Sequence, residues 1–336
     1  GGTLQFVGVR TADVNAFGTG NITVIADSTL NTFVDSARTK SSRLLNAISV
    51  TGGTLTLGTG STGNGSLTFA GGLTATNAAN VTVGGGRVIL ESDLAVNGTG
   101  AFTLTGGTLQ LGNNTATGSI NGGLAFNATA GSLIFNRSDN ATYSGVFSGT
   151  GSLTQAGTGN LTLTSANTYT GVTTVSAGTL TLDSGASLAS SGFTTAAGAT
   201  LALNASTTVT TLSGFGNIQI GSGATLTLNN STGQSIGSGG ASSLASTGAF
   251  SGAGTFVKTG TGLLYVQGDF SSTTTNVTLS GGSFQFVGSS GADTNAFGTG
   301  TITVTANSTL NTFTDATRTK SSRLLNAIVV TGGTLA

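Results

Sequence analysis

The segment GTGNLTLTSANTYTGVTTVSAGTLTLDSG, residues 157–185, contains one short phrase twice. Leu161-Thr162-Leu163 and Leu180-Thr181-Leu182 each follow a step that contains glycine. Alternation with period two places the leucines on one face of a strand and the threonine on the other. A strand this short cannot bury its apolar face alone, so it needs a neighbour that carries the same pattern.

The phrase recurs along the whole chain, with Gly, Asn and Ser between its copies. It reads GGTLTL at 52, GSLTF at 65, GGTLQL at 106, GSLIF at 131, GATLTL at 223 and GGSFQF at 281. If two or three short strands complete one turn of a coil, the next turn lies about 4.8 Å above it and like residues stack. The pattern therefore predicts a β-solenoid, in which each repeat contacts only its neighbours. The absence of proline fits, because proline is excluded from central strands.

A longer period contains these phrases. Residues 1–56 reappear at 281–336, with 42 of 56 positions identical. We expect residues 1–280 to be one long β-solenoid repeat unit and residues 281–336 to begin a second tandem copy continuous with it, within a longer protein. At about 20 residues per rung, one long repeat would hold about 14 irregular rungs.

Composition excludes several classes of partner. The chain has 57 glycines and 6% charged residues, but its 37% apolar residues predict a folded protein rather than a disordered one. The formal net charge of zero gives no electrostatic footprint for nucleic acid. No stretch approaches the roughly 18 consecutive apolar residues of a transmembrane helix, so we expect no membrane span in this segment.

The chain lacks His and Cys, which excludes Ser-His-Asp and Cys-His nucleophiles, ordinary zinc sites, haem ligands and disulfides. We expect no cofactor and no metal. Glu91 and Asp93, with Arg87 nearby, form the one carboxylate pair that could support hydrolysis of a glycosidic bond. Glu91 is the only glutamate in the chain, so a surface pair is the favoured interpretation and we expect no enzyme.

Charge is concentrated in NTFVDSARTKSSRLLNAI, residues 31–48, and in its second copy, residues 311–328. The charged residues of the two copies are Asp35, Arg38, Lys40, Arg43, Asp315, Arg318, Lys320 and Arg323. Leu44, Leu45 and Ile48 follow at a spacing compatible with a short helix, and a loop leaving the solenoid wall is the alternative. The functional interpretation is a docking patch for a neighbouring rod, an anionic glycan or a capping element. The other interpretation is a solvated excursion that keeps strand edges from aggregating.

Threonine pairs at alternate positions raise a further possibility. Thr54 and Thr56, Thr179 and Thr181, and Thr225 and Thr227 could form the regular lattice that an ice-binding solenoid needs. The β-propensity of threonine on an outward strand face explains the same pattern, and the irregular rung lengths disfavour a lattice.

Residues 149–185 resemble the autotransporter-associated β-strand repeat of the passenger domains of bacterial type V secreted proteins. The family's core of Asn-Thr-Tyr-Thr-Gly-x-Thr-Thr-Val is matched by Asn167, Thr168, Tyr169, Thr170, Gly171, Thr173, Thr174 and Val175. A weaker match begins at Gly252, without the core spacing. The resemblance implies a right-handed parallel β-helix on the bacterial cell surface or outside the cell, and it brings no catalytic residue.

The sequence thus predicts an all-β, right-handed parallel β-helix. The leading functional hypothesis is a non-enzymatic extracellular structural protein that forms a surface rod or filament and self-associates end to end or side by side. One alternative is an autotransporter-type adhesin whose patch binds a surface glycan or a host or matrix ligand. The other is a β-helix polysaccharide hydrolase or lyase.

Overall fold

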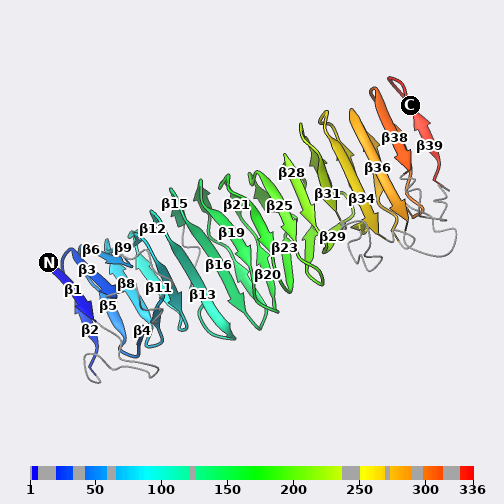
Figure 1. The fold of residues 1–336 in the computed structure, drawn as a ribbon. Helices are drawn as coiled ribbons and strands as arrows, with labels where there is room; N and C mark the ends of the chain where they lie inside the picture. Colours follow the sequence, from blue (N-terminus) through cyan, green and yellow to red (C-terminus); the bar gives the residue numbers. More distant parts are fainter. Residues whose placement is uncertain are drawn as a thin grey trace, which may run out of the picture. The chain divides into compact units, whose positions relative to one another are not determined.

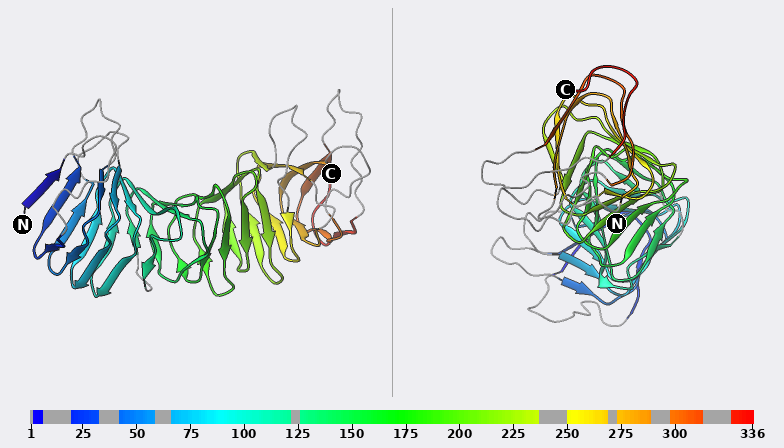
Figure 2. Two further views of the ribbon diagram at one scale, coloured as in Figure 1. Left: turned by 90° about the horizontal axis from the view of Figure 1, so that it is seen from below. Right: turned by 90° about the vertical axis from the view of Figure 1, so that its right-hand side faces the viewer.

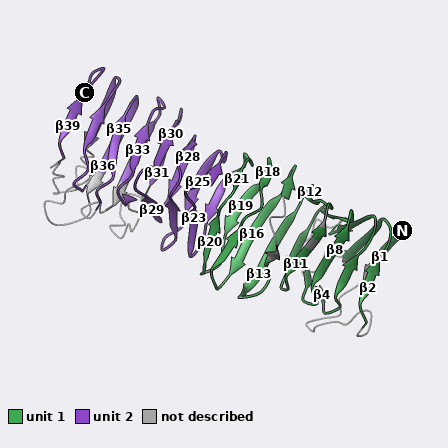
Figure 3. Ribbon diagram, turned by 180° about the vertical axis from the view of Figure 1, so that it is seen from behind, with its two compact units in different colours: residues 1–171 green, residues 172–336 purple. Residues whose placement is uncertain are grey.

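The computed structural model describes residues 2–6, 20–32, 42–58, 66–121, 126–236, 250–268, 273–288, 298–312 and 326–336. Figure 1 shows its strands along the sequence, and Figure 3 shows its two compact units, Gly1–Gly171 and Val172–Ala336, hereafter unit 1 and unit 2. Each is built from short strands, and no α-helix occurs in the residues described. The two units are described separately.

Unit 1 has three walls of stacked strands. The first wall, in stacking order, is β1 (Gly2–Phe6), β3 (Ser28–Thr32), β6 (Thr54–Leu57), β9 (Asn80–Val83), β12 (Phe102–Leu104), β15 (Phe126–Ala128) and β18 (Phe147–Gly149). The second wall is β4 (Ser42–Leu44), β7 (Ser66–Phe69), β10 (Arg87–Leu90), β13 (Thr108–Thr115), β16 (Ser132–Arg137) and β19 (Ser152–Gln155). The third wall contains β2 (Ile22–Val24), β5 (Ile48–Val50), β8 (Leu73–Asn77), β11 (Leu94–Gly98) and β14 (Ile120–Asn121), and then the pair β17 (Ala141–Tyr143) and β20 (Asn160–Leu163). The short β21 (Ala166–Asn167) ends the unit.

Unit 2 repeats the arrangement. One wall is β22 (Thr173–Val175), β25 (Gly192–Thr195), β28 (Thr211–Gly214), β31 (Gln234–Ile236), β34 (Leu263–Gly268), β36 (Gly282–Gly288) and β38 (Ser308–Thr312). Another is β23 (Thr179–Leu182), β26 (Thr200–Leu203), β29 (Asn217–Ile220) and β32 (Phe250–Ser251). The third is β27 (Thr207–Val209), β30 (Thr225–Leu228), β33 (Thr255–Lys258), β35 (Asn276–Leu279), β37 (Ile302–Val304) and β39 (Ile328–Val330), with the short β24 (Ser187–Leu188) before it.

The strands pair in parallel, each with the strand one turn earlier or later, as the views in Figure 2 show. Leu180 pairs with Leu201 and Leu182 with Leu203, so like stacks on like and the leucines are buried. Burying one such side chain contributes about 1.5–3 kcal/mol to stability, and each rung buries several apolar side chains. The predicted fold class, an all-β parallel β-helix, is confirmed.

The rungs differ in length because the segments that connect the strands contain different numbers of residues. In the first wall of unit 1 the stacked positions are Gly2, Ser28, Leu55, Val81, Phe102, Phe126 and Phe147. The steps between these positions are on average longer than the rung of about 20 residues that the sequence suggested. The step from Val81 to Phe102 is shorter than the step from Gly2 to Ser28, because fewer residues connect the strands.

The two copies of the long repeat have the same local register. Gly2 pairs with Ser28 in unit 1, and Gly282 pairs with Ser308 in unit 2. Likewise Ile22 pairs with Ile48, and Ile302 with Ile328. The tandem boundary at residue 281 stays a prediction, because the units divide elsewhere, at residue 171.

Aromatic residues of successive rungs pack on one another in the core. In unit 1 the ring of Phe102 is tilted against that of Phe126 with centroids 4.7 Å apart, and the centroids of Tyr143 and Phe126 are 6.1 Å apart. Burial raises the pKa of the Tyr143 hydroxyl far above its ordinary value. Tyr143 therefore stays neutral.

The described part of the charged stretch differs from one of the expected structures. Residues 42–50 form β4 and β5, so the helix-compatible spacing of Leu44 and Ile48 does not mark a helix there. Both side chains are buried on consecutive strands, while Leu45 between them is exposed. A strand, a turn and a second strand can give the same apolar spacing as a helical turn.

Candidate functional surfaces

The residues of the family core form a structural corner. Asn167 is buried; its side-chain oxygen accepts a hydrogen bond from Phe147 N (2.9 Å), and its amide donates to Ser165 O (2.8 Å). Tyr169 is fully buried with its ring 4.7 Å from that of Phe147. In unit 2 Thr173 donates to Ser190 Oγ at 2.9 Å. These side chains hold the rungs together and leave no reactive group at the surface.

Most of the predicted interaction patch lies outside the described residues. This applies to Asp35, Arg38, Lys40, Asp315, Arg318, Lys320 and Arg323. Arg43 is described, on β4, and its Nε lies 2.7 Å from a carboxylate oxygen of Glu91. The other oxygen of Glu91 accepts from Asn113 at 2.8 Å. This one described patch residue therefore links its rung to a later rung.

The three residues of the carboxylate pair and its arginine have separate partners. Glu91 binds Arg43, whereas Asp93 accepts hydrogen bonds from the backbone N and Oγ of Ser119 at 2.9 and 2.6 Å. These bonds from Ser119 hold the pKa of Asp93 below its usual value. Arg87 donates to Gln110 on the next strand of the wall. Each side chain braces adjacent turns, and a carboxyl group whose pKa is lowered, as that of Asp93 is, is a poor general acid near neutral pH.

The threonine pairs do not stack into a lattice. Thr56 pairs with Thr82, but Thr54 pairs with Asn80. In unit 2 Thr181 pairs with Ala202 and Thr227 with Val257. Two adjacent columns of threonine are therefore missing at these positions, which removes the geometric basis of the ice-binding interpretation.

Sequence reasoning missed a set of buried polar residues at the ends of strands. Gln155 donates to Gly157 O and Gly159 O, both at 2.9 Å, and Gln110 donates to Gly112 O at 2.7 Å. In unit 2 Asn230 donates to Thr232 O, and Lys258 to Gly260 O. Each bonds the carbonyl two residues later. For Gln155, Asn230 and Lys258 this carbonyl lies just after the strand, whereas Gly112 lies within β13, where the register with β16 shifts between Leu111 and Thr115. The signal was present as a polar residue two positions before a turn glycine, in QAG, QLG and KTG.

Lys258 is the unusual member, because it is a fully buried cation between Leu228 and Leu279 in the strand stack. In the described residues no carboxylate forms an ion pair with it. Desolvation lowers its pKa. In unit 1 the neutral Gln155, on β19, makes the same kind of hydrogen bond, to the carbonyl two residues later.

We expect Lys258→Gln to flatten the pH dependence of stability. The cost of burying the charge is fully present below the lowered folded-state pKa and is relieved as pH rises toward about 10.4, the unfolded value, so stability rises over that window. One proton contributes a slope of at most about 1.4 kcal/mol per pH unit. Urea unfolding from pH 7 to about pH 10.4, the unfolded value, measures it, with Gln155→Lys as the reverse control. An unchanged slope in Lys258→Gln contradicts the assignment.

Two comparisons relate the chain to known proteins, one with a repeat family and one with an adhesin. Residues 153–182 match the family model of the passenger-associated-transport-repeat. The chain carries an autotransporter passenger repeat. The match includes Asn167 and Tyr169. The motif therefore contains side chains that contact Phe147 of the preceding rung.

The chain is also similar to a much larger adhesin. It is 36% identical over 189 residues to the adhesin BmaC autotransporter of Brucella suis biovar 1 (strain 1330). The alignment covers 54% of this chain and 5% of that protein. A search of the solved structures found no match.

The repeat and the relative support an autotransporter passenger domain, and they locate the chain at the bacterial cell surface or in the extracellular space. Two structural findings accompany this. The described residues contain no helix that is long and apolar enough to cross a membrane. They also contain no group of three or more acidic side chains that could hold a metal ion.

Proposed function

We propose that the chain is a non-enzymatic β-solenoid scaffold of an adhesin-like surface protein. The observation that carries this is the use of its described charged side chains. Arg43 with Glu91, Arg87 with Gln110, and Asp93 with Ser119 all join different rungs. These groups stabilise the stack instead of converging on one exposed point.

The enzyme alternative has less support. Glycoside hydrolysis needs two carboxyl groups about 5–9.5 Å apart on either side of one bond, one of them protonated. Glu91 is engaged by Arg43 and Asn113, and Asp93 has a lowered pKa. Neither carboxyl group is prepared to act as the acid.

Ligand display is the second candidate function. It is favoured by the similarity to a protein named as an adhesin and by the charge concentrated in residues 31–48 of the sequence. The expected ligand is an anionic surface glycan, bound by Arg38 and Arg43 and by their counterparts Arg318 and Arg323. In this second candidate function the solenoid holds the charged patch in place, and the patch binds the glycan.

Purified chain tested on a glycan array and on soluble polysaccharides separates these functions. We expect no new reducing ends, and glycan binding that falls at least tenfold when Arg38, Arg43, Arg318 and Arg323 are replaced by alanine. Arg87→Ala is the matched control, because it removes an arginine outside the patch. Polysaccharide cleavage that Asp93→Asn abolishes would overturn the non-enzymatic role, and binding unchanged in the quadruple variant would exclude the patch.

A further inference from the structure

Unit 2 carries a partly exposed tyrosine on the outer face of one wall. On β34 the alternation of the strand directs Leu264 and Val266 into the core, where both are fully buried, and Tyr265 between them to the outside. The other two tyrosines of the chain, Tyr143 and Tyr169, are buried in unit 1. Tyr265 therefore presents an aromatic ring on the outside of the stack.

The register of the wall places a polar side chain on each side of Tyr265. Ser235 of β31 pairs with Tyr265 from one side, and Gln285 of β36 pairs with it from the other. Both residues are partly exposed, and neighbouring parallel strands are about 4.8 Å apart. A hydroxyl group and a carboxamide thus lie in one column with the tyrosine, one rung before it and one rung after it. Each of these groups both donates and accepts hydrogen bonds.

An apolar ledge lies next to this column. Leu263, two residues before Tyr265 on the same face of β34, is 37% exposed. Gly233 precedes Gln234, which pairs with Leu264, so Gly233 lies beside Leu263. A Cβ on Gly233 would meet nothing within 4 Å, so the surface beside Leu263 is open on that side. The Tyr265 shelf is the name used below for Ser235, Leu263, Tyr265 and Gln285.

Hydrogen bonds from a buried side chain hold the Tyr265 shelf in place. Asn230, which precedes β31, is almost completely buried. Its side-chain amide donates to Thr232 O at 2.8 Å and to Leu263 O at 3.2 Å. These bonds tie the start of β34 to the turn before β31. A site whose parts are already ordered loses less conformational entropy when a ligand binds.

The Tyr265 shelf is uncharged, and so are the strands of its wall. β22, β25, β28, β31, β34, β36 and β38 contain no Asp, Glu, Lys or Arg. An ionic ligand would lose hydration on these strands without gaining a counter-charge, which is unfavourable. The backbone of β34 is paired on both edges, with β31 and with β36, so a peptide cannot join the sheet there as an added strand. The shelf therefore offers neutral side chains and no free strand edge.

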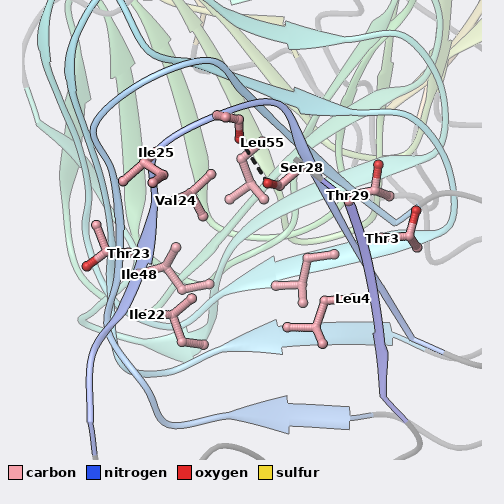
Figure 4. Close-up of a pocket in the computed structure, with 13 residues that line it drawn as sticks. Thr3, Leu4, Ile22, Thr23, Val24, Ile25, Ser28, Thr29, Ile48 and Leu55 are labelled. Carbon is pink, nitrogen blue, oxygen red and sulfur yellow. Dashed lines mark hydrogen bonds between the residues drawn. The ribbon is translucent and has the colours of Figure 1, made fainter.

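The apolar cavity at β1 and β2 has a different character. Leu4, Ile22, Val24, Ile48 and Leu55 line a space of about 330 Å³ (Figure 4). Ile48 and Leu55 are almost completely buried. These side chains belong to the core of the stack, so we assign no ligand to this cavity.

We propose that the Tyr265 shelf binds a neutral oligosaccharide. The ring of Tyr265 and the side chain of Leu263 fit the C–H face of a pyranose, and the tyrosine hydroxyl gives the ring a polar end. Ser235 and Gln285 fit the sugar hydroxyl groups, which also donate and accept hydrogen bonds. The lack of charge selects against sulfated and uronic-acid glycans. The inference goes beyond the proposed function, and it does not depend on the arginine patch, which would bind an anionic glycan.

Fluorine NMR of the tyrosines tests the site, because the chain has only three of them. An array of neutral oligosaccharides of glucose, galactose, mannose and N-acetylglucosamine first selects the probe that binds best. Chain labelled with fluorotyrosine is then titrated with this probe in solution, and Tyr265→Phe identifies the Tyr265 signal. We expect the signal of Tyr265 to shift with added oligosaccharide and the signals of the buried Tyr143 and Tyr169 to stay in place.

Substitutions measure what the aromatic ring contributes. Tyr265→Ala should weaken binding of the selected oligosaccharide at least about tenfold, because a central aromatic contact is lost. Tyr265→Phe keeps the ring and should weaken binding less. Phe215→Ala is the matched control, because Phe215 is another exposed aromatic residue of unit 2, and it should leave the affinity unchanged. The urea midpoint of each variant shows that it is still folded.

Three results would overturn the proposal. They are no binding to any neutral oligosaccharide, a Tyr265 signal that does not move with the bound probe, and an unchanged affinity of the folded Tyr265→Ala variant. Binding to anionic glycans alone, lost when Arg38, Arg43, Arg318 and Arg323 are replaced, would also overturn it and would leave the arginine patch as the binding site.

Discussion

Replacing Tyr169 by alanine is expected to lower the free energy of unfolding by about 3–5 kcal/mol, the range for a buried aromatic side chain. Among the residues that the structure describes, Tyr169 is the largest fully buried side chain, and its ring is tilted against that of Phe147 with centroids 4.7 Å apart. Its removal leaves a cavity at the corner that the family core builds, where the neighbouring backbone is held by Asn167 and cannot collapse freely. Urea unfolding followed by circular dichroism measures the loss.

Phe215→Ala is the matched control for Tyr169→Ala. Phe215 is an aromatic residue at a turn of unit 2 and is 39% exposed. Its truncation should change the free energy of unfolding by no more than about 0.5 kcal/mol. If the two variants lose similar stability, aromatic burial at the corner is not what supports the rung.

Replacing Gly157 by alanine should cost about 3 kcal/mol, at the upper end for overpacking. A Cβ at this position would lie against the backbone N and O of Arg137 in the rung beneath, closer than real Cβ atoms come. The obstacle is backbone, which cannot rotate away, so the two rungs must separate and lose hydrogen bonds such as that from Gly157 N to Phe135 O. A fall of the urea midpoint at constant m-value is the expected observation.

Gly185→Ala tests whether the cost of replacing a glycine depends on close backbone contact with the neighbouring rung. A Cβ on Gly185 would meet nothing within 4 Å. The substitution is therefore expected to be neutral or to stabilise by up to about 1 kcal/mol, since it restricts the unfolded chain. Equal losses at Gly157 and Gly185 would contradict the close-packing argument.

The fold was predictable because one signal is repeated in almost every rung. Alternation in phrases such as Thr54–Leu57 and Thr225–Leu228 marks strands whose leucines stack inward, and the structure has β6 and β30 at those positions. Stacking in parallel demands the same pattern in neighbouring rungs, so a local pattern reports a long-range pairing. Residues 42–50 were harder, because two strands and a corner imitate the spacing of a helix.

The candidate site was less predictable, for a physical reason. Whether a polar residue points into a turn or into solvent depends on the carbonyls that the turn leaves unpaired, and composition does not record them. The KTG pattern places Lys258 two positions before a glycine, but the pattern does not show that the side chain is fully buried and donates a hydrogen bond to Gly260 O. Arg43 belongs to the predicted docking patch, yet it forms an ion pair with Glu91, which lies far away in the sequence.

The shared register of the two similar segments has a consequence for how such a gene can change length. Pairing of Gly2 with Ser28 is repeated by Gly282 with Ser308, and Ile22 with Ile48 by Ile302 with Ile328. If residues 1–280 form the repeat unit that the sequence predicts, recombination between the segments would add or remove one such unit and still join each of these strands to a neighbour in the register it had before. Proteins with different numbers of rungs can therefore arise in one genetic step, and no new strand pairing has to evolve.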